Sequence, residues 1–278
     1  MLCAVVVAFL VACPPAPPAA PPPAPPAAPP PALVRPPSGV GTFPERPRPE
    51  APGLLAIIID DAGYSVKELE PFLDLPVPLT VAVLPNLPHS TEVARQVTAA
   101  GKDLIVHVPM EPDGAENPGP GAILTGESQE EVRRQLETDF ASVPGALGMN
   151  NHMGSRATAD EPLMRVVLGY LKEQDKLFVD SRTTAETAGP RVARELGMPI
   201  LQRDIFLDDD TRPDQIAAWL SKSAEEALSR GTAVAIGHVQ NRAVADILRA
   251  SEKALSARGV RFARLAEVLG RRERIASR

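Results

Sequence analysis

The sequence predicts an α/β fold in which short parallel strands alternate with amphipathic helices. From residue 53 onward, short apolar runs alternate with segments that carry helix start and stop signals. Continuous apolar runs are typical of strands that are buried on both faces of a parallel sheet. Because this alternation repeats six or seven times, we expect either a (β/α) barrel or an open doubly wound sheet.

Six apolar runs are predicted to be strands. In chain order they lie at residues 54–59, 79–84, 104–108, 177–179, 232–236 and 260–263. A shorter run at residues 148–149 precedes Asn150. Neither of the glycine-rich phosphate-binding patterns, GxGxxG and GxxxxGKS/T, occurs in the chain. The sequence therefore does not favour the nucleotide-binding type of doubly wound sheet.

Four segments between these strands begin and end at recognised helix signals. They run from Ser90 to Gly101, from Ser128 to Phe140, from Asp160 to Gln174 and from Pro213 to Gly231. Ser128 and Glu131 have the spacing of a capping box, in which each side chain binds the other residue's backbone N–H. Proline in the first turn and glycine just after the last turn are typical of helix ends.

Residues 1–13 carry features of an export signal. The apolar run from Leu2 to Ala12 is shorter than the about 20 residues that span a bilayer, and it suits the apolar region of a secretory signal. The run ends in Leu-Val-Ala before Cys13, which resembles the lipobox of bacterial lipoproteins, whereas an ordinary cleaved signal is the alternative. We expect an exported protein, periplasmic or tethered to a membrane of the cell envelope, with Cys13 as a candidate lipid anchor.

The rest of the chain divides into a spacer, a folded domain and a tail. Residues 14–52 hold 18 of the 32 prolines, and such sequence forms extended polyproline II of about 3.1 Å per residue rather than a packed core. We interpret this segment as a disordered linker. The domain is predicted to occupy residues 53–270 and to be followed by a frayed basic tail at residues 271–278.

The composition of the 278 residues excludes several classes of function. Lys and Arg total 29 against 35 Asp and Glu, a net charge of −6, so the chain has no excess of positive charge for nucleic acid or an anionic membrane surface. The two cysteines, Cys3 and Cys13, both lie in the export segment. Any metal in the domain must therefore be bound by His, Asp or Glu. Nothing in the sequence indicates an oligomeric state.

Histidines and acids gather at the ends of the predicted strands. The residues at these ends are Asp60, Asp61, His107, Glu111, Asn150, Asn151, His152, Asp180 and His238. In parallel α/β barrels this carboxyl-terminal rim is where active sites form. Adjacent acids at the end of a buried strand are costly unless a cation or hydrogen-bond donors compensate them. A cysteine-free cluster of His and Asp suits a zinc-type metal with an open coordination position.

Each candidate also has a structural interpretation. Asp60 and Asp61 could cap a helix, and the histidines could be buried side chains that satisfy their own hydrogen bonds. His89 precedes the helix that begins at Ser90 and lies either at the site or only in its loop. Asp180 either lines the substrate pocket or caps a turn. The acidic run at residues 208–210 is interpreted as a solvated loop before the helix that begins at Pro213.

These strand ends resemble the motifs of a known family, the polysaccharide deacetylases. The residues that carry the resemblance are Ile59-Asp60-Asp61-Ala62-Gly63 for the TFDDG motif, residues 101–107 for the GHEIxxH approach to the metal, and Ile236-Gly237-His238 for the closing LxH motif. The runs at residues 107–112 and 150–155 look like the divergent branch of that family. The resemblance covers about residues 54–269.

The resemblance implies a distorted (β/α)₇ barrel with a catalytic divalent metal, best matched by Zn²⁺. It implies removal of acetyl groups from an N-acetylated glycan of the cell envelope. If the roles of the matching family motifs are transferred to this sequence, Asp60 would be the general base and His238 the general acid, while Asp61 and His107 would bind the metal. Asn150 or a backbone N–H would stabilise the oxyanion, and Asn151, Asp180 and His89 are further candidates near the substrate or the ligands.

Two departures from the family pattern leave alternatives open. The second histidine of the family's HxxxH motif is replaced by Glu111, and Asn150-Asn151-His152 lies where an arginine–proline motif is expected. We infer that His152 supplies the missing imidazole, with Glu111 as the rival ligand. The alternatives are an inactive barrel that binds glycan or recruits a partner in the envelope, and a metal hydrolase for an ester or phosphoester.

Overall fold

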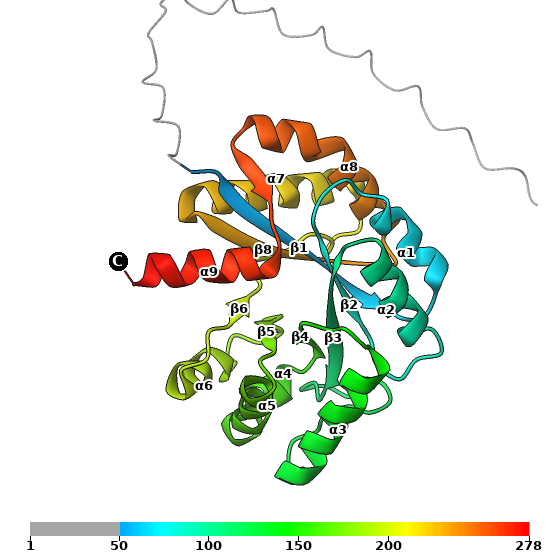
Figure 1. The fold of residues 1–278 in the computed structure, drawn as a ribbon, viewed down its shortest axis with the longest axis vertical. Helices are drawn as coiled ribbons and strands as arrows, with labels where there is room; N and C mark the ends of the chain where they lie inside the picture. The colour runs from blue at the N-terminus through cyan, green and yellow to red at the C-terminus, as the bar shows by residue number, and fades with distance from the viewer. Residues whose placement is uncertain (1–50, 278) are drawn as a thin grey trace, which may run out of the picture. The chain divides into compact units, whose positions relative to one another are not determined.

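The computed structural model describes residues 51–277 (Figure 1). The predicted export segment, its candidate lipid anchor and nearly all of the predicted linker lie outside these residues. Every strand pairing is parallel, and helices surround the sheet. The strand order is β6-β5-β4-β3-β2-β1-β8-β7, and β9 pairs with the start of β1. Within residues 51–277, no pairing joins β6 to β7, so the barrel stays open there.

The strands are short except for β1, and each helix lies between two strands or after the last one. The strands are β1 Gly53–Ala62, β2 Thr80–Val83, β3 Asp103–Met110, β4 Gly148–Met153, β5 Leu177–Asp180, β6 Leu201–Gln202, β7 Ile205–Phe206, β8 Thr232–His238 and β9 Val260–Phe262. The expectation of a distorted (β/α)₇ barrel is confirmed, and the open doubly wound sheet is excluded.

All the helices except the last pack on the outer face of this sheet. They are α1 Val66–Leu73, α2 Ser90–Ala99, α3 Gln129–Ser142, α4 Ser155–Ala159, α5 Glu161–Glu173, α6 Gly189–Leu196, α7 Pro213–Arg230, α8 Arg242–Ala257 and α9 Leu265–Ala276. The predicted capping box before α3 is formed, because Ser128 and Glu131 bind each other's backbone N–H groups. None of the helices in residues 51–277 is long and apolar enough to cross a bilayer.

The period-two pattern of the strands separates two apolar layers. In β1, Leu55, Ile57 and Ile59 pack in the large outer cluster with the helices. Leu54, Ala56 and Ile58 instead pack in an inner cluster. Because side chains alternate between the faces of a strand, Asp60 continues the inner series. In β3 and β8, His107 and His238 likewise lie two residues after an inner-face isoleucine, Ile105 and Ile236, and so point to the same face. The inner column of each of these strands thus changes from apolar to polar at its carboxyl end.

Helix α9 contributes to the inner apolar cluster and corrects one expectation. Its residues Leu265, Val268 and Leu269 pack with the inner face of the sheet. The helix continues to Ala276, so residues 271–276 are helical and not the frayed tail expected from their charge. The expectation of fraying is wrong for residues 271–276, because apolar residues earlier in the helix anchor it to the sheet, while the domain boundary at residue 270 stays a prediction.

Candidate metal and catalytic site

An irregularity in β1 brings two neighbouring carboxylates to one side of the sheet. Successive residues of a regular strand point to opposite faces. Here the register between β1 and β2 shifts between Ile59 and Ala62, and Asp61 has a φ of 64°, which is uncommon for a residue other than glycine. Both carboxylates therefore approach the same imidazole. His107 Nε2 lies 3.6 Å from Asp60 Oδ2 and 3.2 Å from Asp61 Oδ1.

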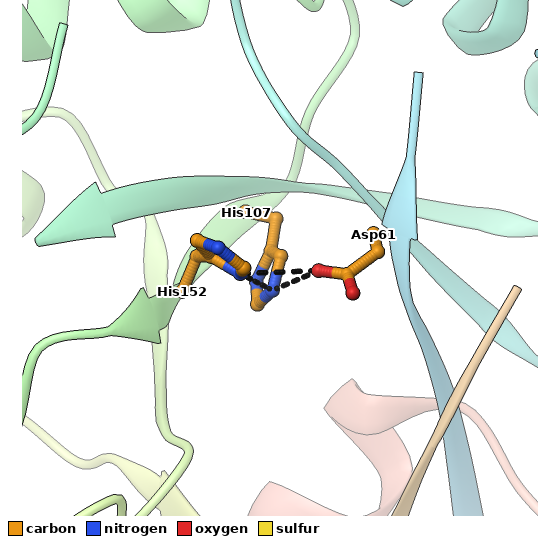
Figure 2. Close-up of side chains that lie close together, drawn as sticks. All are labelled: Asp61, His107 and His152. Atoms are coloured by element: carbon orange, nitrogen blue, oxygen red, sulfur yellow. Dashed lines mark hydrogen bonds and ion pairs between the residues drawn. The ribbon is translucent and has the colours of Figure 1, made fainter. Parts of the chain in front are cut away.

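Three side chains from three parallel strands converge at this point (Figure 2). His152 Nδ1 lies 3.1 Å from Asp61 Oδ1 and 3.2 Å from His107 Nε2. Together with the 3.2 Å between His107 and Asp61, these contacts form a nearly equilateral triangle of one oxygen and two nitrogens. His107 is buried, whereas Asp61 and His152 are partly exposed. The triangle is thus open to solvent on one side.

The chemistry of this triangle fits a divalent cation. Ligand atoms bonded at 2.0–2.1 Å in a tetrahedral arrangement are about 3.3 Å apart, close to the observed spacing. Asp61 Oδ1 is buried and forms no well-aligned hydrogen bond among residues 51–277, although the two imidazole nitrogens lie 3.1 and 3.2 Å from it. A buried carboxylate oxygen without a partner costs free energy that a bound cation would remove. Two imidazoles and one carboxylate also match the ligand set of catalytic zinc, with a fourth position left for a substrate.

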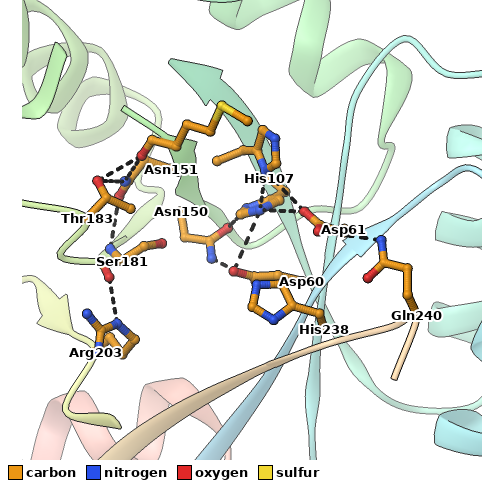
Figure 3. Close-up of polar contacts among 12 residues, drawn as sticks. Asp60, Asp61, His107, Asn150, Asn151, Ser181, Thr183, Arg203, His238 and Gln240 are labelled. Carbon is orange, nitrogen blue, oxygen red and sulfur yellow. Dashed lines mark hydrogen bonds and ion pairs between the residues drawn. The ribbon is translucent and has the colours of Figure 1, made fainter. Parts of the chain in front are cut away.

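Asn150 sets which nitrogen of His107 faces the triangle (Figure 3). Its Nδ2 donates a hydrogen bond of 2.9 Å to Asp60 Oδ1, so its Oδ1 faces His107 Nδ1 at 2.7 Å. An amide oxygen only accepts, and His107 Nδ1 must therefore carry the proton. The lone pair of Nε2 is then directed at the triangle. Fixing a ligand's tautomer through its other ring nitrogen is usual in protein metal sites.

A second pair, His238 and Asp208, lies at the neighbouring strand ends. His238 is paired in register with Asp60 across β8 and β1. Asp208 accepts hydrogen bonds from the backbone N–H of His238 at 3.0 Å and from its Nδ1 at 2.9 Å. Burial alone would lower the pKa of His238, but the Asp208 carboxylate outweighs it and raises that pKa to about 9. His238 is therefore protonated at neutral pH and can donate a proton from Nε2.

Asp208 was not identified as a functional residue from the sequence. The expectation of a solvated acidic loop at residues 208–210 is wrong for this position, because Asp208 is only 7% exposed. The one available signal was its position after a short apolar run, Ile205 to Leu207. A two-residue strand such as β7 leaves no recognisable pattern, so the strand-end rule could not be applied to it.

Burial shapes the pKa values of the two adjacent acids differently. Burial raises the pKa of Asp60 above its usual value, although the charges of His107 and His238 and the amide of Asn150 oppose this effect. Burial would also raise the pKa of Asp61, but the two imidazoles that flank it prevail and lower that pKa well below its usual range. Asp60 is thus the more basic carboxylate of the two, as proton abstraction requires.

Four other candidates from the sequence do not join the triangle. Glu111 Oε2 accepts hydrogen bonds from the backbone N–H and the hydroxyl of Thr125 at 2.6 and 2.5 Å. Asn151 binds the backbone of the β5–α6 loop, and Asp180 accepts from Arg182 N and Thr187 Oγ1 within that loop. Both residues shape the loop. His89 is exposed at the N-cap of α2, with no hydrogen bond to the cluster among the described residues.

An open parallel (β/α) barrel with an Asp–His–His cluster at the carboxyl-terminal rim of its strands defines a polysaccharide deacetylase-like protein. The chain belongs to the divergent polysaccharide deacetylase family, whose model matches residues 57–269. Family membership agrees with the expectation drawn from the strand-end motifs.

Relatives of this chain are found in bacteria. An uncharacterized protein of Haemophilus influenzae is 36% identical over 191 residues, which is 69% of this chain and 68% of the relative. The uncharacterized protein YibQ of Escherichia coli is 33% identical over 68% of this chain, which spans only 60% of its length. Among solved structures, the uncharacterized protein ATU2773 from Agrobacterium tumefaciens matches with a TM-score of 0.72 at 20% identity. That match covers 76% of this chain and 87% of the other, and it supports the fold.

Proposed function

We propose that the chain is a metal-dependent hydrolase that removes acetyl groups from an N-acetylated glycan. The observation that carries the proposal is the convergence of Asp61, His107 and His152 within hydrogen-bond distance of one another, beside Asp60. The family supports a glycan as the substrate. From the export features of residues 1–13 we further propose that the substrate belongs to the cell envelope.

Two residues beside the triangle would carry the proton transfers. A zinc-like ion bound by Asp61, His107 and His152 would supply Lewis acidity toward the acetyl carbonyl and the attacking water. Asp60, whose pKa is raised by burial, would accept the proton of that water. His238 would donate a proton from Nε2 to the departing amine, because its Nδ1 is bound to Asp208. Acid–base assistance of this kind contributes about 10²–10⁴-fold to the rate.

Asn150 is a poor candidate for stabilising the oxyanion, contrary to one of our expectations. Its amide nitrogen donates to Asp60 and its amide oxygen faces His107. The side chain lies fully buried among these partners. We propose that it orients the base and one metal ligand instead, and that a backbone N–H or the cation takes the oxyanion role.

The test is release of acetate from chitotetraose by the full chain loaded with zinc. We expect turnover in the wild type and a loss of at least about 10²-fold in Asp60→Asn, because the base is removed while the shape is kept. Asp246→Asn changes an exposed acid on α8 and serves as the matched control. A wild-type chain that binds zinc but releases no acetate from any N-acetylated glycan would contradict the proposal.

An inactive glycan-binding barrel is the second candidate, and one observation favours it. The residue at the family's second metal-histidine position, Glu111, is bound to Thr125 and lies 3.4 Å from Arg156, so it cannot act as the usual ligand without rearrangement. If this interpretation holds, chitotetraose binds to the chain with equal affinity in wild type and Asp60→Asn, and no acetate is released. The same pair of proteins therefore distinguishes the two functions.

A further inference from the structure

A basic cavity with two lobes lies at the open edge of the barrel, between β6 and β7. One lobe has a volume of about 400 Å³ and is lined by residues that include Arg182, Arg203, Arg230 and Arg272. The other lobe, of about 410 Å³, shares three of these arginines and extends to Phe206, Trp219 and Lys222. It is also lined by three acids, Asp204, Asp209 and Glu226, so the excess of positive charge lies in the first lobe. Volumes of this size are typical of small-molecule sites. We call the two lobes together the seam cavity.

The first lobe concentrates positive charge in a chain that is acidic as a whole. It contains four arginines and a single acid, Asp204, whereas the whole chain has a net charge of −6. Asp204 binds Arg272 at 2.5 Å and lies 3.9 Å from Arg230, so it partly neutralises these two. The remaining two arginines have no ion-pair partner within residues 51–277.

Arg182 and Arg203 are held in place by neutral groups. Arg182 donates to the amide oxygen of Gln202 at 3.0 Å. Arg203 donates to the backbone oxygens of Ser181 and Arg182 at 2.7 and 2.9 Å. These bonds position the two guanidinium groups, and neither group forms a direct ion pair within residues 51–277, although Asp180 and Asp209 lie near enough to attract Arg203. An anion that enters the cavity would find preorganised arginines whose remaining N–H groups suit bidentate binding of an oxyanion.

One aromatic ring connects this cavity to the candidate catalytic site. The guanidinium carbon of Arg203 lies 3.7 Å from the centroid of the Phe206 ring. The same ring stacks on the imidazole of His238, with centroids 5.8 Å apart. Figure 3 shows His238 next to Asp60, and Arg203 farther from the triangle, bound to Ser181. A ligand in the seam cavity is thus separated from the candidate general acid by little more than one side chain.

We propose that the seam cavity binds the carboxylate of an acidic sugar, so that the glycan recognised by this protein is both N-acetylated and anionic. The inference rests on the proposed function, because it names the substrate class of that site. A concave site of this volume, which is joined to His238 through the Phe206 ring, favours one sugar residue of the substrate over the surface of an acidic protein. Arg182 and Arg203 are the specificity-determining residues.

The test is a binding titration that needs neither metal nor turnover. Trp219, the only tryptophan of the chain, lines the cavity and reports on its occupancy by fluorescence. The full metal-free chain is titrated with N-acetylmuramic acid and, in parallel, with N-acetylglucosamine, which lacks the lactyl carboxylate. We expect the acidic sugar to change the fluorescence saturably and the neutral sugar to bind at least about 10-fold more weakly, since a charge-assisted hydrogen bond is lost.

The variants Arg182→Gln and Arg203→Gln should each weaken binding of N-acetylmuramic acid about 10-fold or more. Arg95→Gln removes an exposed arginine of α2 that is paired with Glu92, and it should leave the affinity unchanged. Arg203 also binds two backbone oxygens, so a loss of binding in its variant alone does not separate recognition from folding. Arg182→Gln keeps the test decisive, because Arg182 is exposed and its side chain contacts a single amide.

Each outcome separates this inference from the proposed function. Equal responses to both sugars, or none to either, overturn it even if acetate is released from chitotetraose. A response to inorganic phosphate or to a polyglutamate peptide without one to N-acetylmuramic acid also overturns it, because the site would then serve a free anion or an acidic protein. Selective binding of the acidic sugar supports it even if no deacetylation is found.

Discussion

Asn150 lies between Asp60 and His107 and joins the candidate base to a candidate metal ligand. The three residues come from β4, β1 and β3, and His107 is paired in register with Asn150. The amide nitrogen of Asn150 donates a hydrogen bond to Asp60, the candidate base, and its amide oxygen accepts one from the imidazole of His107. Asn150 is fully buried, so water cannot substitute for either contact. The geometry makes the base and the metal site mutually dependent.

The variant Asn150→Asp should weaken zinc binding. It replaces the amide donor by a carboxylate oxygen, which cannot donate to Asp60 and places two buried acids side by side. We expect zinc affinity to fall about 10–100-fold, as is usual when a partner of a metal ligand is lost. Affinity is measured by competition with a chromophoric chelator, and Asn117→Asp in the exposed loop after β3 is the control. An unchanged affinity would show that Asn150 does not orient His107.

His152 and Glu111 are distinguished by a matched pair of variants. His152→Gln removes a vertex of the triangle, so zinc affinity should fall by more than about 100-fold, beyond the effect of an outer partner. Glu111→Gln should leave zinc affinity unchanged, because its carboxylate is bound to Thr125. Instead it should lower the melting temperature, since the backbone N–H of Thr125 loses a charged acceptor. The reverse order of zinc affinities would identify Glu111 as the third ligand.

Much of the fold could be predicted because its signals are local. The buried runs of β1, β3 and β8 are continuous and apolar, and the ends of α3 and α7 carry capping signals. The two-residue strands β6 and β7 have too few positions to show a pattern. Whether the sheet curls into a barrel depends on where its edges meet. That is a property of the whole sheet, and only the resemblance to a family indicated it.

The site was predictable to the extent that it depends on strand order. Parallel strands end at one rim, so Asp61, His107 and His152 could be expected to meet there. What each side chain contacts depends on register and on local irregularities. The bulge that turns Asp61 inward leaves no signal in the sequence. Alternation predicts that Asn150 and Asn151 point to opposite faces, but not which of the two points inward and which toward the β5–α6 loop.

The variant Asp208→Asn should lower the pKa of His238. The carboxylate of Asp208 keeps that pKa at about 9 against the effect of burial, so removing its charge should lower it by roughly 1–3 pH units. The titration is followed by NMR of the imidazole in the metal-free chain. Because the general acid must be protonated, the high-pH limb of acetate release should also move to lower pH. Asp209→Asn, at an exposed neighbouring acid, should change neither quantity.

Asp139 should make the folded protein less stable as the pH rises, whereas an ion-paired acid makes it more stable. Its carboxyl is fully buried in α3, and burial raises its pKa to about 7 although Gln135 and Asn86 donate to it. The folded state therefore disfavours the ionised form. The contribution of Asp139 to stability is greatest below 3.8, the usual pKa, and declines as the pH rises to about 7. Between pH 5 and pH 8 this decline amounts to about 2–3 kcal/mol.

The variant Asp139→Asn tests this directly, because it keeps the shape and an acceptor oxygen but cannot ionise. Its free energy of unfolding, measured by urea denaturation, should gain about 2–3 kcal/mol relative to wild type between pH 5 and pH 8. The N–H₂ group of the new amide replaces Asp139 Oδ2, which has no hydrogen-bond partner among residues 51–277, so the variant loses some stability at every pH. For this reason the two proteins are compared by how much their free energy of unfolding changes with pH. Asp246→Asn, exposed on α8, should run parallel to wild type. If the free energy of unfolding of Asp139→Asn also changes with pH in parallel with wild type, Asp139 titrates near its usual pKa. The loop containing Asn86 would then open enough to hydrate its carboxyl group.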